Sequence, residues 1–237
     1  MKYIRYYASV VSVLLLLSLL IFTSCSEDGG DDGYDNSIST PTGMHNDKGY
    51  VDLGLSVKWA TCNVGANSPE EYGDYFAWGE TTPKIRYSKS TYKYYNGIYY
   101  TKYCTSSSYG TVDNKTTLEL TDDAARVNWG GNWRMPTRAE QDELRDTDNC
   151  TWTWITQNGV KGYKVTSKNN ANSIFLPAAG YYDGDILFEG NSYGDYWSSS
   201  LDPTYDAAFG MDFEETYIDW YGKGGRAYGR PVRAVCP

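Results

Sequence analysis

The fold is decided by residues 122–144, which read DDAARVNWGGNWRMPTRAEQDEL. Thr121 can cap a helix over residues 122–127, because two acids in its first turn suit the helix dipole and two glycines follow it. The segment Thr137–Glu140 is a capping box, which predicts a second helix that runs to about Asp146. These are the only two helices that the sequence predicts.

Outside these helices the chain consists of short apolar runs cut by Gly, Asn, Asp and Pro, which is typical of strands. Phe209, Met211 and Phe213 alternate with small or polar residues, so one face of that strand should be buried. The sequence therefore predicts an α+β fold with a twisted, mostly antiparallel sheet and long loops. The expected strands are a hairpin of 49–54 with 56–62, then 75–78, 173–177, 196–199, 207–213, 216–220 and 232–235.

The first part of the chain is typical of an exported lipoprotein. Residues 1–24 have two bases and then an apolar run that is too short to span a membrane, as in a signal peptide. Cys25 follows small residues and resembles the lipidated cysteine of bacterial lipoproteins, although Phe22 stands where Leu is usual. A plain signal peptide with an incidental cysteine is the alternative.

Residues 25–48 are acidic and glycine-rich, which predicts a flexible tether. An acidic run just after the lipidated cysteine resembles the surface-export signal of Bacteroidetes lipoproteins, and a solvated linker without an address is the alternative. We expect lipid anchoring in the outer membrane, with the domain of residues 49–237 facing the exterior.

The charge of the chain excludes one class of partner. Its 21 Lys and Arg against 30 Asp and Glu give a net charge of −9, and nucleic-acid binding needs the opposite surplus. Residues 48–237 hold 24 acids and 19 bases, so the folded part is only mildly acidic. His45 is the single histidine and falls in the expected tether, which leaves little histidine chemistry.

Six motifs occur in an order that resembles the Fibrobacter succinogenes major paralogous domain, which is common in Bacteroidetes lipoproteins. They are VDLGLSVKWATCNVGA, GDYFAWGET, DDAARVNWGGNWRMPTRAEQDEL, SIFLPAAGYYDG, GDYWSSS and GRPVRAVCP. The resemblance covers residues 49–237 and implies a C-type-lectin-like fold, distantly similar to that of formylglycine-generating enzymes. It implies no activity, because most of this family has none assigned.

Four cysteines follow Cys25, and an even number in an oxidising compartment suggests two disulfides. Three pairings are open, and four free thiols are the alternative. The resemblance implies that the first and last strands lie side by side, which favours Cys62 with Cys236 and leaves Cys104 with Cys150.

Tyrosine is unusually frequent, at 24 of 237 residues, and many tyrosines gather near the C-terminus between the expected strands. Trp59, Trp78, Trp129, Trp133 and Trp197 lie inside the motifs and are expected in the core. Binding loops favour tyrosine because it is large, rigid and carries a hydroxyl; ordinary strand tyrosines are the alternative. The predicted ligand-binding residues are Tyr182, Tyr205, Asp206, Tyr217, Asp219, Trp220, Tyr221, Arg226 and Tyr228.

These observations favour a binding module for a glycan or a cell-surface protein. No enzyme is predicted, because no cysteine has a base beside it and the adjacent acids are typical of a solvated face. Asp183 and Asp185 could donate oxygens to calcium, but Asp-Gly-Asp reads first as a tight turn, so no cofactor is predicted. A structural subunit of a surface complex or fimbria, and an enzyme of an unrecognised kind, remain the alternatives. The tract 202–228 also resembles the variable region of lectin-fold proteins that retroelements diversify.

Overall fold

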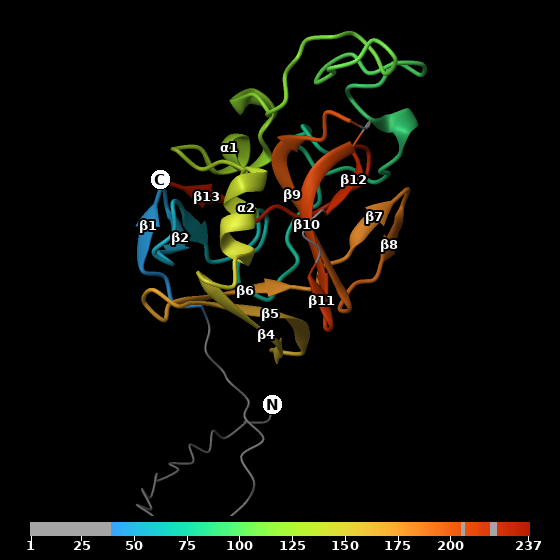
Figure 1. Cartoon of the computed structure of the whole chain (residues 1–237). Coiled ribbons are helices and arrows are strands. Elements are labelled where there is room, and N and C mark those ends of the chain that lie inside the picture. The colour runs from blue at the N-terminus through green and yellow to red at the C-terminus, as the bar shows by residue number, and fades with distance from the viewer. Residues whose placement is uncertain (1–38, 205–206, 219–221) are drawn as a thin grey trace, which may run out of the picture. The chain divides into compact units, whose positions relative to one another are not determined.

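A computed structural model of the chain describes residues 39–204, 207–218 and 222–237, shown in Figure 1. In these residues strands and loops predominate, and α1 and α2 are the only α-helices. No helix in the described ranges has the length and apolar character needed to cross a membrane. Two single-turn 3-10 helices precede α1, namely η1 (Lys89–Thr91) and η2 (Leu120–Asp122).

Both predicted helices are present. α2 (Arg138–Arg145) begins at Thr137, whose Oγ1 accepts a hydrogen bond from the Glu140 backbone N–H at 3.3 Å. The Glu140 carboxylate accepts the Thr137 N–H at 2.8 Å, so the capping box is complete. α1 (Ala124–Trp129) begins later than predicted, because Asp123 is its N-cap and η2 occupies the residues before it.

The first sheet joins the start of the described chain to its end. Its strand order is β1-β2-β3-β13, with neighbouring strands antiparallel. The predicted boundary at residue 49 is therefore wrong: Ser39 is already buried, and β1 pairs with β2. His45 lies in the fold as well, where its Nε2 accepts the Asn132 N–H at 2.8 Å. The strands are β1 (Gly43–His45), β2 (Lys48–Val51), β3 (Lys58–Ala60) and β13 (Val235–Cys236).

The second sheet is built around β10 (Ala207–Glu214), which pairs antiparallel with three strands. These are β9 (Tyr193–Leu201), β11 (Tyr217–Ile218) and β12 (Lys223–Gly225). The predicted alternation holds only from Met211 to Phe213, where both ends are fully buried and Asp212 is half-buried. It is wrong at the start of the strand, where Phe209 is half-buried and Gly210 is buried, because the register with β9 shifts between Ala208 and Gly210. The expected strand 75–78 is reduced to one bridge between Phe76 and Arg230.

A third sheet contains two strands that the sequence analysis missed. β4 (Cys150–Gln157) and β5 (Val160–Ser167) pair over eight residues each, and β5 also pairs with the predicted β6 (Ser173–Pro177). Asn158 and Gly159 form the turn, with φ values of 48° and 83°. A separate hairpin of β7 (Tyr181–Asp183) and β8 (Ile186–Phe188) follows. Its turn at Gly184 agrees with the tight turn expected at Asp-Gly-Asp.

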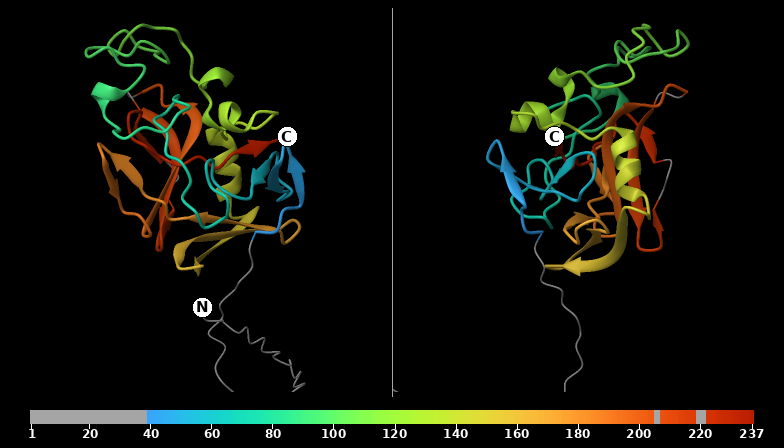
Figure 2. Two further views of the ribbon diagram at one scale, coloured as in Figure 1. Left: turned by 180° about the vertical axis from the view of Figure 1, so that it is seen from behind. Right: turned by 60° about the vertical axis from the view of Figure 1, so that its left-hand side comes forward.

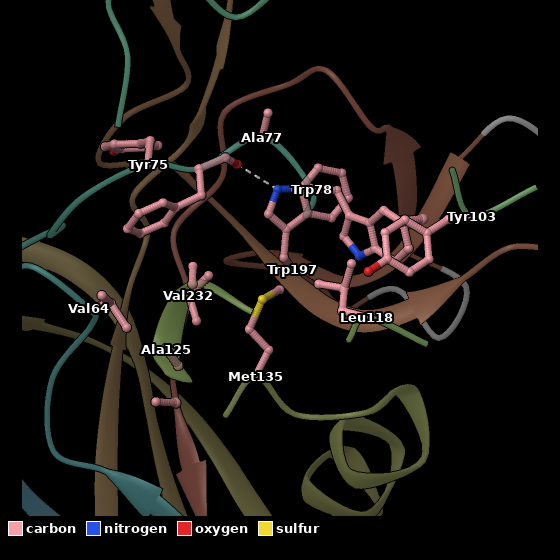
Figure 3. Packing of buried hydrophobic residues seen from close by; sticks show 14 of the residues in the cluster. Val64, Tyr75, Ala77, Trp78, Tyr103, Leu118, Ala125, Met135, Trp197 and Val232 are labelled. Carbon is pink, nitrogen blue, oxygen red and sulfur yellow. Dashed lines mark hydrogen bonds between the residues drawn. The ribbon is translucent and has the colours of Figure 1, made fainter. Parts of the chain in front are cut away.

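Two clusters of buried apolar residues form the core. The first contains Trp78, Trp133 and Trp197, and Figure 3 shows Trp78 and Trp197 with Tyr103, Leu118 and Val232 packed around them. The second contains Trp59 and fills the space between the third sheet and β9–β10. All five tryptophans expected in the core are buried. The strand-rich mixture with two helices and antiparallel sheets confirms the α+β class.

The described cysteines are free thiols, which contradicts the predicted disulfides. β13 does lie beside β3, but Cys236 pairs with Lys58, four residues before Cys62. β3 ends at Ala60, so Cys62 lies beyond the strand residues that face Cys236. Cys62 instead donates to the Ala66 carbonyl at 3.4 Å.

The second predicted pair is separated as well. Cys104 lies in the loop between η1 and η2 and donates to the Ser106 carbonyl at 3.1 Å. Cys150 begins β4 in the second core cluster. The green loop and β4 lie at opposite ends of the ribbon in Figure 1 and in both views of Figure 2. Burial raises the pKa of the Cys150 thiol to about 11, so this group stays protonated.

Candidate functional site

A pocket of about 380 Å³ opens between the β7–β8 hairpin and the second sheet. We call it the tyrosine–carboxylate pocket and define it by Tyr181, Tyr193, Asp195, Asp212, Tyr228 and Arg230. Glu189, Lys223 and Gly224 complete its lining. It combines three phenol rings with charged groups of both signs, in the C-terminal region where the tyrosines gather.

Two carboxylates face each other in this pocket. Asp195 on β9 and Asp212 on β10 are direct partners in the antiparallel register. Like charges directly opposite each other destabilise a sheet, so this pair needs compensation. Arg230 supplies part of it, since its Nη1 lies 2.7 Å from Asp195 Oδ1. The Tyr193 hydroxyl supplies another part by donating to Asp212 Oδ2 at 2.5 Å.

A proton on Asp195 supplies the rest of the compensation for the two facing carboxyl groups. Asp195 is 2 % exposed, and burial raises its pKa to about 7. The guanidinium of Arg230 opposes this rise, and the carboxylate of Asp212 adds to it. The pKa of the Tyr193 phenol is also raised, first by burial and then by its hydrogen bond to Asp212. A buried carboxyl that titrates near neutral pH beside a second carboxylate is typical of a functional site.

The side chain of Arg230 packs against the core residue Trp197. Its Cζ lies 4.2 Å from the ring centroid of Trp197, whose indole N–H donates to the Phe76 carbonyl at 2.8 Å. The side chain is 5 % exposed. Gly224 lies so close that a Cβ there would be 2.0 Å from Arg230 Nη2. Only glycine at this position leaves room for the guanidinium.

The hydrogen bonding of the buried pair is incomplete. Arg230 Nε and Nη1 and Asp195 Oδ1 have no hydrogen-bond partner among the described residues, because the 2.7 Å ion pair lacks hydrogen-bond geometry. Buried polar atoms without partners are rare in folded proteins, since each costs about 1–3 kcal/mol. These atoms are covered by the fold itself, and they belong to residues whose other atoms line the pocket.

The rim of the pocket is held by backbone bonds to the rest of the fold. Tyr228 packs against Tyr181, with ring centroids 5.7 Å apart. Between these residues, Tyr182 and Gly229 exchange backbone hydrogen bonds of 2.8 and 3.0 Å. Glu189, which follows β8 and lines the pocket, has a φ of 56°. This backbone conformation costs energy for a residue with a Cβ.

A second pocket, of about 560 Å³, lies where α2 and β4 meet the turn between β10 and β11. Trp152, Tyr163 and Ile218 give it an apolar wall, and Arg145 and Lys168 contribute positive charge. Tyr217, a predicted ligand-binding residue, lines this pocket and is 49 % exposed.

The structure places the other predicted site residues in different surroundings. Tyr228 lines the tyrosine–carboxylate pocket. Tyr182 points into the fold, where its ring packs on Tyr75 at 4.8 Å. Arg226 is 1 % exposed and donates to the Tyr103 carbonyl at 2.9 Å, so its role is structural. Cys25, Tyr205, Asp206, Asp219, Trp220 and Tyr221 lie outside the described residues.

Comparison with known proteins adds no family to this description. No family model, curated protein or solved structure matches the chain. Among the described residues no three His, Cys, Asp or Glu side chains are grouped so that they could hold a metal ion. The chemistry of the site is therefore inferred from the chain's own residues.

Sequence analysis missed Asp195 and Asp212. Tyr181 and Tyr193 belong to the C-terminal group of tyrosines that favours a binding surface, but they are not among the predicted ligand-binding residues. One available signal was an acid next to an expected strand, because Asp195 in GDYWSSS directly precedes the strand expected at 196–199. A charged residue in a buried strand needs a partner, and Arg230 in GRPVRAVCP is the charge that it meets.

Proposed function

We propose that the chain binds a neutral glycan in the tyrosine–carboxylate pocket. The observation that carries this proposal is the buried Asp195–Arg230 pair, which lines a pocket rimmed by three tyrosines. A sugar ring has apolar C–H faces and hydroxyl groups that both donate and accept. Aromatic rings suit the first, and a carboxylate with a guanidinium suits the second.

The size of the pocket favours a small ligand or one unit of a larger one. Small-molecule sites have volumes of about 300–1,000 Å³, and this pocket lies near the lower end. A protein partner would have to cover about 800 Å² of this chain, most of it outside the pocket. The pocket by itself therefore supports a sugar better than it supports a protein.

The charges of the pocket favour a neutral ligand. Its lining contains three acids, Glu189, Asp195 and Asp212, and two bases, Lys223 and Arg230. Lys223 lies 3.4 Å from Asp202, and Arg230 faces Asp195, so each base has an acidic neighbour. Because Asp195 is partly protonated near pH 7, the lining carries little net charge. A strongly anionic or cationic ligand would find no matching excess.

The proposed setting is the cell surface, as an outward-facing lipoprotein of the Fibrobacter succinogenes major paralogous type with a C-type-lectin-like fold. The six ordered motifs, Cys25 and the acidic segment after it support this setting. The resemblance implies that the first and last strands are adjacent; β13 lies in the same sheet as β1 and pairs with β3. A Cys25→Ala variant should leave the membrane fraction, and unchanged fractionation would exclude lipidation.

The binding proposal is tested on a glycan array with the full-length chain purified in detergent. Tyr181→Ala and Tyr228→Ala should each weaken binding by about tenfold, since each removes an aromatic contact. Tyr99→Ala is the matched control, because Tyr99 is half exposed and lies in the loop after η1, away from the pocket lining. If the wild type binds no glycan, or if all three variants bind equally well, the proposal is wrong. Absence of glycan binding would favour the assembly-subunit alternative.

A further inference from the structure

The pocket continues into an exposed aromatic face on the β7–β8 hairpin. Tyr181 and Phe188 are direct partners across the hairpin, so their side chains lie on the same face. Their rings are 5.7 Å apart with an interplanar angle of 17°. Because Tyr181 also contacts Tyr228, three rings follow one another from the pocket out to Phe188. We call the row Tyr228, Tyr181 and Phe188 the aromatic platform.

The outer end of the platform is exposed to solvent. Phe188 is 39 % exposed, and Ile186 on the same face is 59 % exposed. Phe188 belongs to neither core cluster of the described residues. Single exposed apolar residues are ordinary, but an apolar strip that extends a polar pocket indicates a binding surface.

The hairpin that carries the platform is fixed at both ends. At its base, Tyr182 and Gly229 exchange two backbone hydrogen bonds. At its turn, the Tyr87 N–H donates to the Gly184 carbonyl at 2.6 Å, and the Gly184 N–H donates to the Tyr87 carbonyl at 2.7 Å. An isolated two-stranded hairpin is only marginally stable, so these four bonds are what hold the rings in place. A ligand that stacks on the platform loses little energy in ordering it.

From this continuity we infer that the ligand is an oligosaccharide of at least two units rather than a single sugar. One unit occupies the pocket, and the next stacks its C–H face on Phe188. This inference rests on the proposed function, because it assigns a second subsite to the same ligand. Phe188 is then the residue that determines the preference for chain length.

The hairpin offers a matched control on its other face. Leu187 pairs with Tyr182, so it points away from the platform, and at 36 % it is about as exposed as Phe188. Removing either side chain deletes a similarly exposed apolar group from the same strand. Of these two side chains, Phe188 is the one whose ring stacks on Tyr181.

The test is titration calorimetry of the full-length chain in detergent, with the mono-, di- and tetrasaccharides of N-acetylglucosamine, glucose and galactose as probes. At least one series should show a gain of about tenfold in affinity from mono- to disaccharide. Phe188→Ala should abolish that gain, so that mono- and disaccharide bind this variant with equal affinity. Phe188→Tyr should restore the gain, and Leu187→Ala should behave as wild type.

The outcomes separate this inference from the proposed function. Equal affinity of the wild type for mono- and disaccharides in every series that binds would refute the second subsite and leave the pocket as a sugar site. A gain that survives in Phe188→Ala would refute the role of Phe188. If no probe binds, both proposals fail.

Discussion

The proton on Asp195 links the pocket to the stability of the fold. Burial raises the pKa of this carboxyl to about 7 from the ordinary value of 3.8. Between those two pH values the folded chain keeps a proton that the unfolded chain has released. Raising the pH through this window therefore destabilises the folded state, and the loss is nearly complete above about pH 8.

The size of the effect follows from the two pKa values. Ionisation of Asp195 alone should lower the free energy of unfolding by roughly 2 to 3 kcal/mol between pH 5 and pH 8. The side chain is almost fully buried, so solvent screens little of this difference. Asp195→Asn removes the titrating group and keeps its shape. Any constant cost of the substitution cancels when the change between the two pH values is compared.

The assay is urea denaturation of the full-length chain, followed by tryptophan fluorescence at several pH values from 5 to 8. The free energy of unfolding of Asp195→Asn should rise relative to that of the wild type by roughly 2 to 3 kcal/mol across this range. Asp113→Asn is the control, because backbone N–H groups of Tyr103 and Cys104 hold the pKa of Asp113 below its ordinary value. That control should run parallel to the wild type. Parallel curves for wild type and Asp195→Asn would refute the raised pKa.

Three further predictions concern the cap, the pocket floor and the thiols. Thr137→Ala should lower the free energy of unfolding by about 1 kcal/mol in urea denaturation, because alanine removes the N-cap acceptor of α2. Thr137→Ser keeps that acceptor and should not lower it. Equal stability of the wild type and both variants would contradict the role of Thr137 as the cap. Gly224→Ala should weaken glycan binding more than Gly225→Ala in calorimetry. A Cβ at 224 would lie 2.0 Å from Arg230 Nη2, whereas the atom nearest to a Cβ at 225 is Tyr228 Cε2 at 3.6 Å. Equal binding by these two variants would show that Arg230 is not held as described. In denaturant without reductant, the four described cysteines should all react with a thiol reagent, and fewer than four reactive thiols per chain would restore the disulfide hypothesis.

Sequence signals that act over a few residues predicted the fold best. The box of Thr137 and Glu140 fixes α2 because both hydrogen bonds form within one turn. For α1 the same reasoning missed the start by two residues, since two acids follow Thr121 and either acid could cap. The structure uses Asp123, whose second oxygen also accepts the Met135 N–H at 2.8 Å. That long-range bond decides the cap and is invisible in a local pattern.

The missed β4–β5 hairpin shows a different limit. Its Asn158–Gly159 turn is among the strongest hairpin signals, and both residues have the positive φ that a type I′ turn needs. β4 alternates threonine with tryptophan rather than with aliphatic residues, so it does not show a simple apolar stripe. Trp152 and Trp154 pack on Tyr163, which makes this an aromatic face of the second core cluster. The turn signal alone could have found it.

The set of residues that forms the pocket could not be predicted from the sequence, for a geometric reason. Its residues come from β7, β9, β10 and the segment after β12, and composition cannot tell which face of a strand a tyrosine occupies. Tyr181 and Tyr182 are neighbours in the chain, yet one lines the pocket and the other packs into the core. The tyrosine excess indicated the right region of the chain. Register and strand pairing selected the residues.

The three buried arginines near the C-terminus show why one of them is assigned to the site. Arg233 is used fully by the fold, because its Nε, Nη1 and Nη2 donate to Asn63 and to backbone carbonyls. Arg226 has an unpartnered Nε among the described residues, but it lines neither of the two pockets described above. An unsatisfied donor alone is therefore weak evidence for a ligand. Arg230 combines unsatisfied donors with a place in the pocket lining and with an acidic partner that titrates near pH 7. The coincidence of these three features at one residue, rather than any one of them, distinguishes a binding guanidinium from a structural one.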